Sequence, residues 1–465
     1  MDSTAPEFYE NRTFDEIAIG DSAEITRVLG ERDLHLFAAI SGDIDPDGGA
    51  PLAGQLSVPM VADGMWGGAL VAAVLGTRLP GPGMVHLGQT LHFHQPVSPG
   101  DRLTVRVTVT AREAAGQRVT LACEGRNQSG AVVLDGEAEV RAPRQKMRVA
   151  VAAAPDVRLH RAGQRFGALV ARAADLPPLP TAVIHPCDEL SIAGAEQARA
   201  AGLIVPLWVG PRDKILAAAE AAGATLDPAE IVDAPHSHAA AEAAVALVRE
   251  GRAGALMKGK LHTDEVMEAV LDRACGLRTE RRISHVFALD TPGLDRLLFI
   301  TDAAINIAPD LGVLRDIVQN ALDLVMALGV RVPRVALLSA VETVSDRLPS
   351  TLLAAAICKM HDRGQITGGL VDGPLAFDNA ISPAAVAAKG IVSAVAGRAD
   401  ILVVPNLESG NMIAKQLIHL GGAEAAGIAL GARVPIMLTS RADSAAARLA
   451  SAALARLHAA QARPV

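Results

Sequence analysis

Residues 297–311 read LLFITDAAINIAPDL, a short apolar run that ends in a polar turn. Runs of the same kind recur after about residue 165, each followed by a polar or Gly-rich turn and then by an Ala-rich segment. They are TAVIHP (181–186), GLIVPLWVG (202–210), ALMKG (255–259), SHVFALD (284–290), VALLSA (335–340), GGLVDGP (368–374), DILVVPN (400–406) and VPIMLTS (434–440). Continuous apolar runs indicate parallel strands buried on both faces of a sheet. This part of the chain is therefore predicted to be α/β, with ligands bound at the carboxyl ends of the strands.

The first 145 residues follow a different pattern. DRLTVRVTVT (101–110) alternates apolar and polar residues strictly, which predicts a half-buried strand. QRVTLACEG (117–125) and AVVLDGEAEV (131–140) follow directly and indicate an antiparallel sheet. MWGGALVAAVLGTRL (65–79) is apolar almost all round and predicts a buried helix, whose glycines allow close approach of the sheet. A helix wrapped by an antiparallel sheet is the α+β hot-dog arrangement.

The two patterns meet near residue 150, in a stretch of basic residues, prolines and small residues. We therefore expect a hot-dog domain over 1–145, a linker over 146–164 and an α/β domain over 165–465.

The composition excludes several classes of protein. With 50% hydrophobic and 20% charged residues the chain is not disordered, and a net charge of -8 with scattered basic residues argues against a nucleic-acid partner. The four cysteines lie far apart, which fits neither a metal knuckle nor a disulfide framework. The acidic start is no signal peptide and no apolar run reaches the ~18 residues of a membrane span, so we expect a cytoplasmic enzyme without a membrane partner.

GALMKGK (254–260) has the spacing of a phosphate-binding loop, but Leu261 stands where that loop needs Ser or Thr for magnesium. Bulky Leu256 and Met257 suit a strand better. The residues leave two interpretations, a strand end that carries a functional Lys258 or Lys260, and a plain surface turn.

A series of longer motifs resembles the phosphate acetyltransferase and phosphate butyryltransferase family, most closely its butyryl branch, over about 165–465. The motifs are LMKGKLHTDEVM, LFITDAAINIAPDL, DIVQNALDL, VALLSAVETV, GGLVDGPLAFDNAIS, GRADILVVPNLESGNMIAKQL and VPIMLTSRADS. The resemblance implies two doubly wound α/β subdomains of isocitrate-dehydrogenase-like type with a cleft between them, usually in a dimer. It also implies the reversible conversion of acyl-CoA and phosphate to acyl phosphate and CoA, with no metal and no permanently bound cofactor.

The same resemblance implies a catalytic group. Ser440 and Arg441 match the Ser-Arg pair of the family, and a guanidinium holds phosphate through two hydrogen bonds. The catalytic aspartate of the acetyl branch falls on Ala447 here, so we expect the nearby Asp443 to act as the thiol base. Helix capping by Ser440 or Asp443 is the structural alternative.

Polar residues that follow the strand-like runs are expected to contact the substrate, or alternatively to tie loops together. They are Lys258, Asp302, Asn306, Asp372, Asn379 and Asn411.

SGDIDPDGGA (41–50) resembles the start of a calcium loop, but Gly54 stands where the bidentate glutamate is needed. With ADGMWGGALV and LPGPGMVHLGQTLHFHQPVSPGDRL, it resembles instead the MaoC-like (R)-specific enoyl-CoA hydratases, which are hot-dog proteins. The family's Asp is Asp43, its histidine has become Gly48, and its second histidine has become Asp63. Because glycine transfers no proton, the resemblance implies a vestigial hydratase site.

The sequence thus predicts a phosphate acyltransferase, acetyl or butyryl, with a hydratase-like first domain that is inactive. A bifunctional enzyme that also hydrates short enoyl-CoA, and a non-catalytic acyl-CoA-binding protein, remain as alternatives. The expected partners are acyl-CoA, phosphate, acyl phosphate and further copies of the chain.

Overall fold

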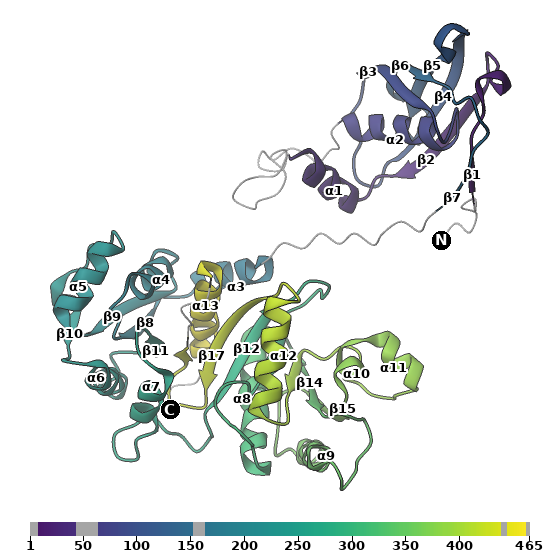
Figure 1. Cartoon of the computed structure of the whole chain (residues 1–465). Helices are drawn as coiled ribbons and strands as arrows, with labels where there is room; N and C mark the ends of the chain where they lie inside the picture. The colour runs from purple at the N-terminus through teal and green to yellow at the C-terminus, as the bar shows by residue number, and fades with distance from the viewer. Residues whose placement is uncertain (1–7, 43–63, 152–162, 439–443, 462–465) are drawn as a thin grey trace. The chain divides into compact units, whose positions relative to one another are not determined.

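The computed structural model describes residues 8–42, 64–151, 163–438 and 444–461. The chain divides into two compact units, Met1–Leu159 and His160–Val465 (Figure 1). No helix among the described residues is long and apolar enough to cross a membrane.

The first unit is a five-stranded antiparallel sheet in the order β2-β4-β5-β6-β3 with α2 packed on it, as the sequence predicts. Its elements are β2 (Ser22–Val28), α1 (Glu31–Ser41), α2 (Gly64–Thr77), β3 (Val85–Phe93), β4 (Arg102–Glu113), β5 (Arg118–Arg126) and β6 (Val132–Arg141). In β4 the predicted inner positions Leu103, Val105, Val107 and Val109 are buried. A Cβ on Gly67 of α2 would lie 2.4 Å from Leu134 Cδ2, so this glycine permits the close helix–sheet approach.

Part of the stretch expected as a linker is a strand. β7 (Arg148–Ala150) pairs antiparallel with β1 (Phe8–Glu10), and the Arg148 guanidinium lies 3.9 Å from the centre of the Phe8 ring. The next described element, α3, begins at Gln164.

The second unit is built on an 11-stranded sheet in the order β10-β9-β8-β11-β18-β17-β12-β13-β16-β14-β15 (Figure 1). The strands are β8 (Leu179–Ile184), β9 (Ile204–Gly210), β10 (Ile231–Asp233), β11 (Ala255–Lys258), β12 (Ser284–Asp290), β13 (Leu298–Thr301), β14 (Arg334–Leu338), β15 (Leu370–Leu375), β16 (Ile401–Val403), β17 (Glu424–Leu430) and β18 (Ile436–Met437). The helices are α3 (Gln164–Ala174), α4 (Glu189–Ala200), α5 (Arg212–Ala221), α6 (Ser237–Arg249), α7 (Thr263–Leu271), α8 (Leu311–Ala327), α9 (Pro349–Asp362), α10 (Phe377–Ile381), α11 (Pro383–Lys389), α12 (Leu407–His419) and α13 (Ala445–Gln461).

Both faces of this sheet are covered by helices, as its continuous apolar strands predict. Val183 of β8 belongs to one apolar core with side chains of α3, α4, α8, α9 and α13. Its neighbours Ala182 and Ile184 point to the opposite face, into a core shared with α6 and α7. Side chains of α10 and α12 cover the same opposite face in the second half of the sheet.

The expectation of parallel strands is wrong for β12, the strand of the run SHVFALD. β12 pairs antiparallel with both β17 and β13, and β17 pairs antiparallel with β18. The strands on either side of this centre are parallel among themselves. Six of the seven residues of β12 are buried. Its apolar run therefore indicates a strand buried on both faces, and this holds for a parallel and for an antiparallel strand alike.

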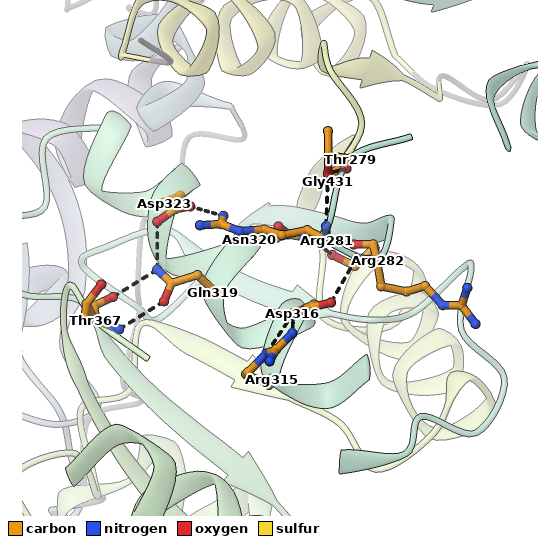
Figure 2. A network of polar contacts seen from close by, with 11 residues as sticks. Thr279, Arg281, Arg282, Arg315, Asp316, Gln319, Asn320, Asp323, Thr367 and Gly431 are labelled. Atoms are coloured by element: carbon orange, nitrogen blue, oxygen red, sulfur yellow. Dashed lines mark hydrogen bonds and ion pairs between the residues drawn. The ribbon is translucent and has the colours of Figure 1, made fainter. Parts of the chain in front are cut away.

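A polar network braces this antiparallel centre against α8 (Figure 2). Asn320 donates through Nδ2 to the Arg282 carbonyl at 3.0 Å and to Ser284 Oγ at 2.9 Å, at the start of β12. Thr279 donates to the Gly431 carbonyl at 2.7 Å, just after β17. Gly431 has φ +94°, and a Cβ there would lie 2.4 Å from the Arg282 carbonyl oxygen, so only glycine fits this crossing.

Candidate functional site

The turn after β13 is organised by one carboxylate, that of Asp302, which is 2% exposed. Its Oδ1 accepts hydrogen bonds from the backbone N–H groups of Ala304 and Ile305, both at 3.0 Å. Its Oδ2 accepts from Asn306, through the backbone N–H at 3.2 Å and the side-chain Nδ2 at 2.6 Å. The carboxylate is therefore committed to its own turn and holds the Asn306 side chain in place.

The N-terminal part of α12 closes over this turn. Asn411 donates through Nδ2 to the Ala303 carbonyl at 3.3 Å, and Leu407 donates its backbone N–H to the Ile307 carbonyl at 3.0 Å. A Cβ on Gly410 would lie 3.0 Å from both Ala303 Cβ and the Asp302 carbonyl oxygen. Asp302, Asn306 and Asn411, three residues predicted separately from the sequence, thus form one cluster.

His285 lies beside Asp302 on the neighbouring strand and is 2% exposed. Its Nδ1 has no hydrogen-bond partner, and its ring packs edge-on against Phe287 with 4.4 Å between ring centres. Burial lowers the pKa of the imidazole to about 4, against the opposing effect of the Asp302 charge. A neutral histidine is therefore buried under the cluster, a feature that sequence reasoning missed because the residue sits inside an apolar run.

Lys258 ends β11 in the other half of the sheet, which agrees with the strand-end interpretation of GALMKGK. Its Nζ donates to the Leu261 carbonyl at 3.4 Å. β11 pairs in parallel with β18, with Leu256 opposite Ile436 and Met257 opposite Met437. Lys258 therefore comes next to the point where the chain leaves β18 toward Ser440.

Ser440, Arg441 and Asp443 lie outside the described residues, so the site is defined here by its two flanks, Leu438 and Ser444. Leu438 packs against the apolar core of α6 and α7, and Ile305 from the Asp302 turn packs against the same core. Ser444 donates to Glu424 Oε2 at 2.9 Å and accepts the Ala447 N–H at 3.1 Å, as a residue that caps α13 does. Ala447, which stands where the acetyl branch carries its aspartate, is only 4% exposed.

Asp372 and Asn379 form a separate group at the far end of the sheet. Asp372 in β15 accepts a hydrogen bond from Ser393 Oγ, which sequence reasoning missed, and one from the Gly373 N–H at 2.8 Å. The pKa of the Cys358 thiol is raised to about 12, mainly because the thiol is buried and to a smaller extent because the Asp372 carboxylate is nearby. Asn379 is fully buried and donates to Glu342 Oε2 at 3.3 Å, while its Oδ1 has no partner.

The hydratase-like motif cannot be placed in the same way, because Asp43, Gly48 and Asp63 all lie outside the described residues. The start of α2, which follows Asp63 in the sequence, borders a cavity of about 230 Å³ whose lining includes Gly64, Gly67, Phe93 and Leu134. A Cβ on Gly64 would lie 2.7 Å from the Phe93 ring, so the glycine lets the ring approach the helix end.

No group of three or more His, Cys, Asp or Glu side chains suited to hold a metal ion occurs in the part of the chain that the structure describes. The four cysteines are free thiols.

Comparison with known proteins identifies the class to which this fold and site belong. The family model for phosphate acetyl/butaryl transferase matches residues 213–456, and the model for the FAS1-like dehydratase domain region matches residues 50–136. The chain belongs to the phosphate acetyl/butyryl transferase family, with a dehydratase-like hot-dog region before it, and it is an enzyme of the phosphate acyltransferase class.

Individual relatives place it more narrowly. The phosphate acetyltransferase of Rhizobium meliloti is 60% identical over 299 residues, which are 64% of this chain and 95% of that protein. The phosphate butyryltransferase of Clostridium acetobutylicum is 42% identical over 270 residues, 58% of this chain and 90% of that protein. A branched-chain phosphotransacylase from Enterococcus faecalis has a solved structure with a TM-score of 0.53 and 29% identity, covering 60% of this chain and 99% of that one. The identities correct the expected closeness to the butyryl branch, because the acetyltransferase is the nearer of the two relatives.

Proposed function

We propose that the α/β domain expected over 165–465 transfers a short acyl group between CoA and phosphate, and that Ser440, Arg441 and Asp443 carry out the chemistry. The observation that supports this best is the parallel pairing of β11 with β18, since its register continues to Lys258 and Leu438, and Leu438 directly precedes the segment 439–443 in the sequence. We also take the two parallel halves of the sheet as the two doubly wound subdomains of the isocitrate-dehydrogenase type.

The reaction needs three functions, and these residues can supply them. A base removes the thiol proton, because the thiolate is the nucleophile, and we assign this role to Asp443. Arg441 grips two oxygens of the phosphate or acyl phosphate, with Lys258 as a second cation. The Ser440 hydroxyl donates to the carbonyl oxygen as it becomes an oxyanion. CoA acts as a substrate, and no permanently bound cofactor takes part in this scheme.

The polar cluster after β13 has a different part in the proposal. Asn306 and Asn411 are the groups of this cluster that we expect to contact the substrate, and Asp302 holds Asn306 toward it. Asp372 and Asn379 are proposed to contact the substrate from the second half of the sheet. The unsatisfied Oδ1 of Asn379 supports a role in binding, because a buried acceptor without a partner is costly to keep.

The proposal is tested by release of CoA thiol from acetyl-, propionyl- and butyryl-CoA in the presence of phosphate. Ser440→Ala and Arg441→Ala are each expected to lower kcat/KM by about 10²-fold or more, the usual cost of removing an oxyanion or phosphate contact. Arg398→Ala, at an exposed arginine of the same unit, serves as the control. Activity near wild type in both site variants would remove the assignment. Tight CoA binding without turnover of any of the three acyl groups would favour a non-catalytic acyl-CoA-binding protein instead.

For the hot-dog domain expected over 1–145, we propose a scaffold without hydratase activity, because Gly48 replaces the histidine of the acid/base pair. Loss of the crotonyl-CoA absorbance measures hydration directly. The wild-type chain is expected to be inactive, and the combined change Gly48→His with Asp63→His to restore turnover. Rapid hydration by the unaltered chain would instead establish a bifunctional enzyme.

We further propose that the chain forms homo-oligomers and that β3 contributes to the contact. β3 ends the sheet of the first unit, and Val85, Leu87 and Phe93 on it are 43%, 46% and 44% exposed. Its sequence VHLGQTLHF is nearly symmetric about Gln89, so antiparallel pairing with a second copy would set Leu87 opposite Leu91.

The strand at the opposite edge of the sheet, β2, carries charge, as expected for an edge strand that does not pair with another chain. Its Glu24 forms an ion pair with Arg106 at 2.6 Å, and charged side chains hinder the pairing of an edge strand with another strand. β3 has no Lys, Arg, Asp or Glu.

The free thiols of the chain fit a reducing compartment, and we propose a cytoplasmic location on that ground.

A further inference from the structure

The two faces of the second unit's sheet are packed differently at its antiparallel centre. On one face, Val286 of β12 and Ile428 of β17 are buried in a single apolar core with side chains of α8 and α13. On the other face the apolar side chains form two separate cores, one with α6 and α7 and one with α10 and α12. Ala429 of β17 belongs to the first of these cores, and Ala425 of the same strand packs against the second. The boundary between the two cores therefore falls at Gly427, the position between them on the same face.

Gly427 lies in a row of residues that crosses the sheet toward the proposed catalytic segment. On one side, Phe287 of β12 pairs directly with Gly427. On the other side, Ala429 pairs antiparallel with Ile436 of β18, and this register continues to Gly427 and Leu438. Residues that lie opposite each other in an antiparallel pair project to the same face of the sheet. The row therefore sets Phe287 and Leu438 on either side of a glycine, on the face that is divided into two cores.

All three residues of this row are partly exposed. Phe287 is the one residue of β12 that is not buried, and it packs against the core of α10 and α12. Leu438 packs against the core of α6 and α7. At a spacing of about 4.8 Å between strands, the Cα atoms of Phe287 and Leu438 are about 10 Å apart. Because Gly427 has no side chain, the gap between the phenyl ring and the leucine has two apolar ends and a bare backbone floor.

The phenyl ring has a fixed place beside the polar cluster that follows β13. It packs edge-on against His285, with 4.4 Å between ring centres, and His285 lies beside Asp302 on the neighbouring strand. The Gly427 N–H donates to Ser451 Oγ of α13 at 3.1 Å, which holds the glycine in position. A Cβ on Gly427 would lie 2.9 Å from His285 Nε2. A larger residue therefore cannot enter the row without displacing the imidazole against which Phe287 packs.

We propose that the acyl group of the substrate lies over Gly427 and that Phe287 limits the length of its chain. The inference rests on the proposed function, since it takes the segment 439–443, directly after Leu438, as the place where the thioester reacts. An acyl group is polar at its carbonyl and apolar beyond it, so its site needs polar groups at one end and apolar groups beyond them. Leu438, Gly427 and Phe287 lead away from the segment 439–443 in this order and offer no charged side chain. The phenyl ring at the far end leaves room for only a few carbon atoms, which makes acyl groups from acetyl to butyryl the preferred class.

The test measures kcat/KM in the presence of phosphate for acetyl-, butyryl- and hexanoyl-CoA. Phe287→Ala is expected to raise the ratio of hexanoyl to acetyl by about tenfold or more, since each methylene that enters an apolar pocket contributes about fourfold. Phe287→Leu should give a smaller rise in the same direction. Gly427→Ala is expected to act in the opposite sense and to lower the ratio of butyryl to acetyl by about fourfold, because its methyl group takes the space of the chain. Phe299→Leu, at a phenylalanine of β13 that is buried in the core of the opposite face, is the matched control and should leave both ratios unchanged.

A second readout does not depend on turnover, namely the rise in Tm that each acyl-CoA produces. Hexanoyl-CoA is expected to stabilise the Phe287→Ala variant more than acetyl-CoA does, and the wild type to show no such excess. This result in a chain without transferase activity would sink the proposed function and leave the inference standing. An active Phe287→Ala variant whose acyl preference and Tm shifts equal those of the wild type would overturn the inference alone. Phe287→Leu keeps most of the apolar contact and carries the same test where the alanine variant fails to fold.

Discussion

Asp302→Asn is the substitution that separates an organising carboxylate from a catalytic one. The asparagine keeps one carbonyl oxygen, which can still accept from Ala304 and Ile305. Its NH₂ group replaces the Oδ2 acceptor and faces two donors of Asn306, the backbone N–H and Nδ2. Two hydrogen bonds to a charged acceptor are lost, each with a net value of roughly 1.5–3 kcal/mol, and relaxation of the turn recovers part of this. We expect a loss of about 3 kcal/mol in the free energy of unfolding.

For a unit of roughly 300 residues this loss corresponds to a fall in Tm of about 5 °C, since the unfolding entropy is about 2.1 cal/mol/K per residue. Differential scanning calorimetry with and without phosphate measures it, and the acyl transfer rate is followed in parallel. Asp310→Asn is the matched control, because Asp310 caps α8 through a single bond to the Val313 N–H, and asparagine caps a helix equally well. If Asp302→Asn abolished turnover at an unchanged Tm, the carboxylate would be a reacting group and the structural reasoning would be refuted.

Three further substitutions test other parts of the structure. The pKa of His285 lies at about 4 in the folded chain and near 6.5 in the unfolded chain, so the unfolded state takes up the proton as the pH falls from 6.5 to 4, and about 3 kcal/mol of stability is lost. Urea unfolding of His285→Gln should lack this part of the pH dependence. If the free energy of unfolding fell equally with pH in the variant and the wild type, the expectation would be contradicted. Gly259→Ala is expected to cost about 1–3 kcal/mol, because its Cβ meets backbone oxygen atoms that cannot move independently, and a Tm equal to wild type would show that the turn relaxes freely. Gln89→Lys sets like charges face to face at the centre of the proposed β3 pairing and should shift the oligomer toward smaller species in sedimentation velocity, whereas an unchanged distribution would place the contact elsewhere.

Much of the local structure is predictable because single segments determine it. The strict alternation of residues 101–110 can bury one face only as a strand, and the alternate residues Leu103, Val105, Val107 and Val109 are buried as that requires. The bulky residues inside GALMKGK favour a strand over a phosphate loop, and β11 ends at Lys258. The pairing of Asp302 with Asn306 follows from one turn of chain in which a carboxylate meets nearby N–H groups.

What the sequence conceals depends on contacts between distant segments. The hydroxyl that satisfies Asp372 comes from Ser393, and nothing in the local pattern marks that serine. His285 is hidden for a similar reason, since one polar residue in an apolar run reveals its role only when the neighbouring strand supplies Asp302. The direction of β12 is equally invisible, because burial on both faces demands the same residues in a parallel and in an antiparallel strand.

Strand direction also changes how the candidate residues are grouped. The rule that polar turns gather at the carboxyl ends of strands places them all on one edge only when every strand runs the same way. Here β18, β17, β12 and β13 alternate in direction, so the ends of β11 and β18 point to one edge of the sheet and the ends of β13, β16 and β14 to the other. Ile305 from the Asp302 turn nevertheless packs against the core that also holds Leu261 and Leu438, which lie next to the first edge. The reversal at β17 and β12 is therefore the point where the polar residues that follow β11 and β18 approach those that follow β13, through shared apolar packing. We expect a substitution in one of these two groups to alter the part of the acyl transfer kinetics that depends on the other group.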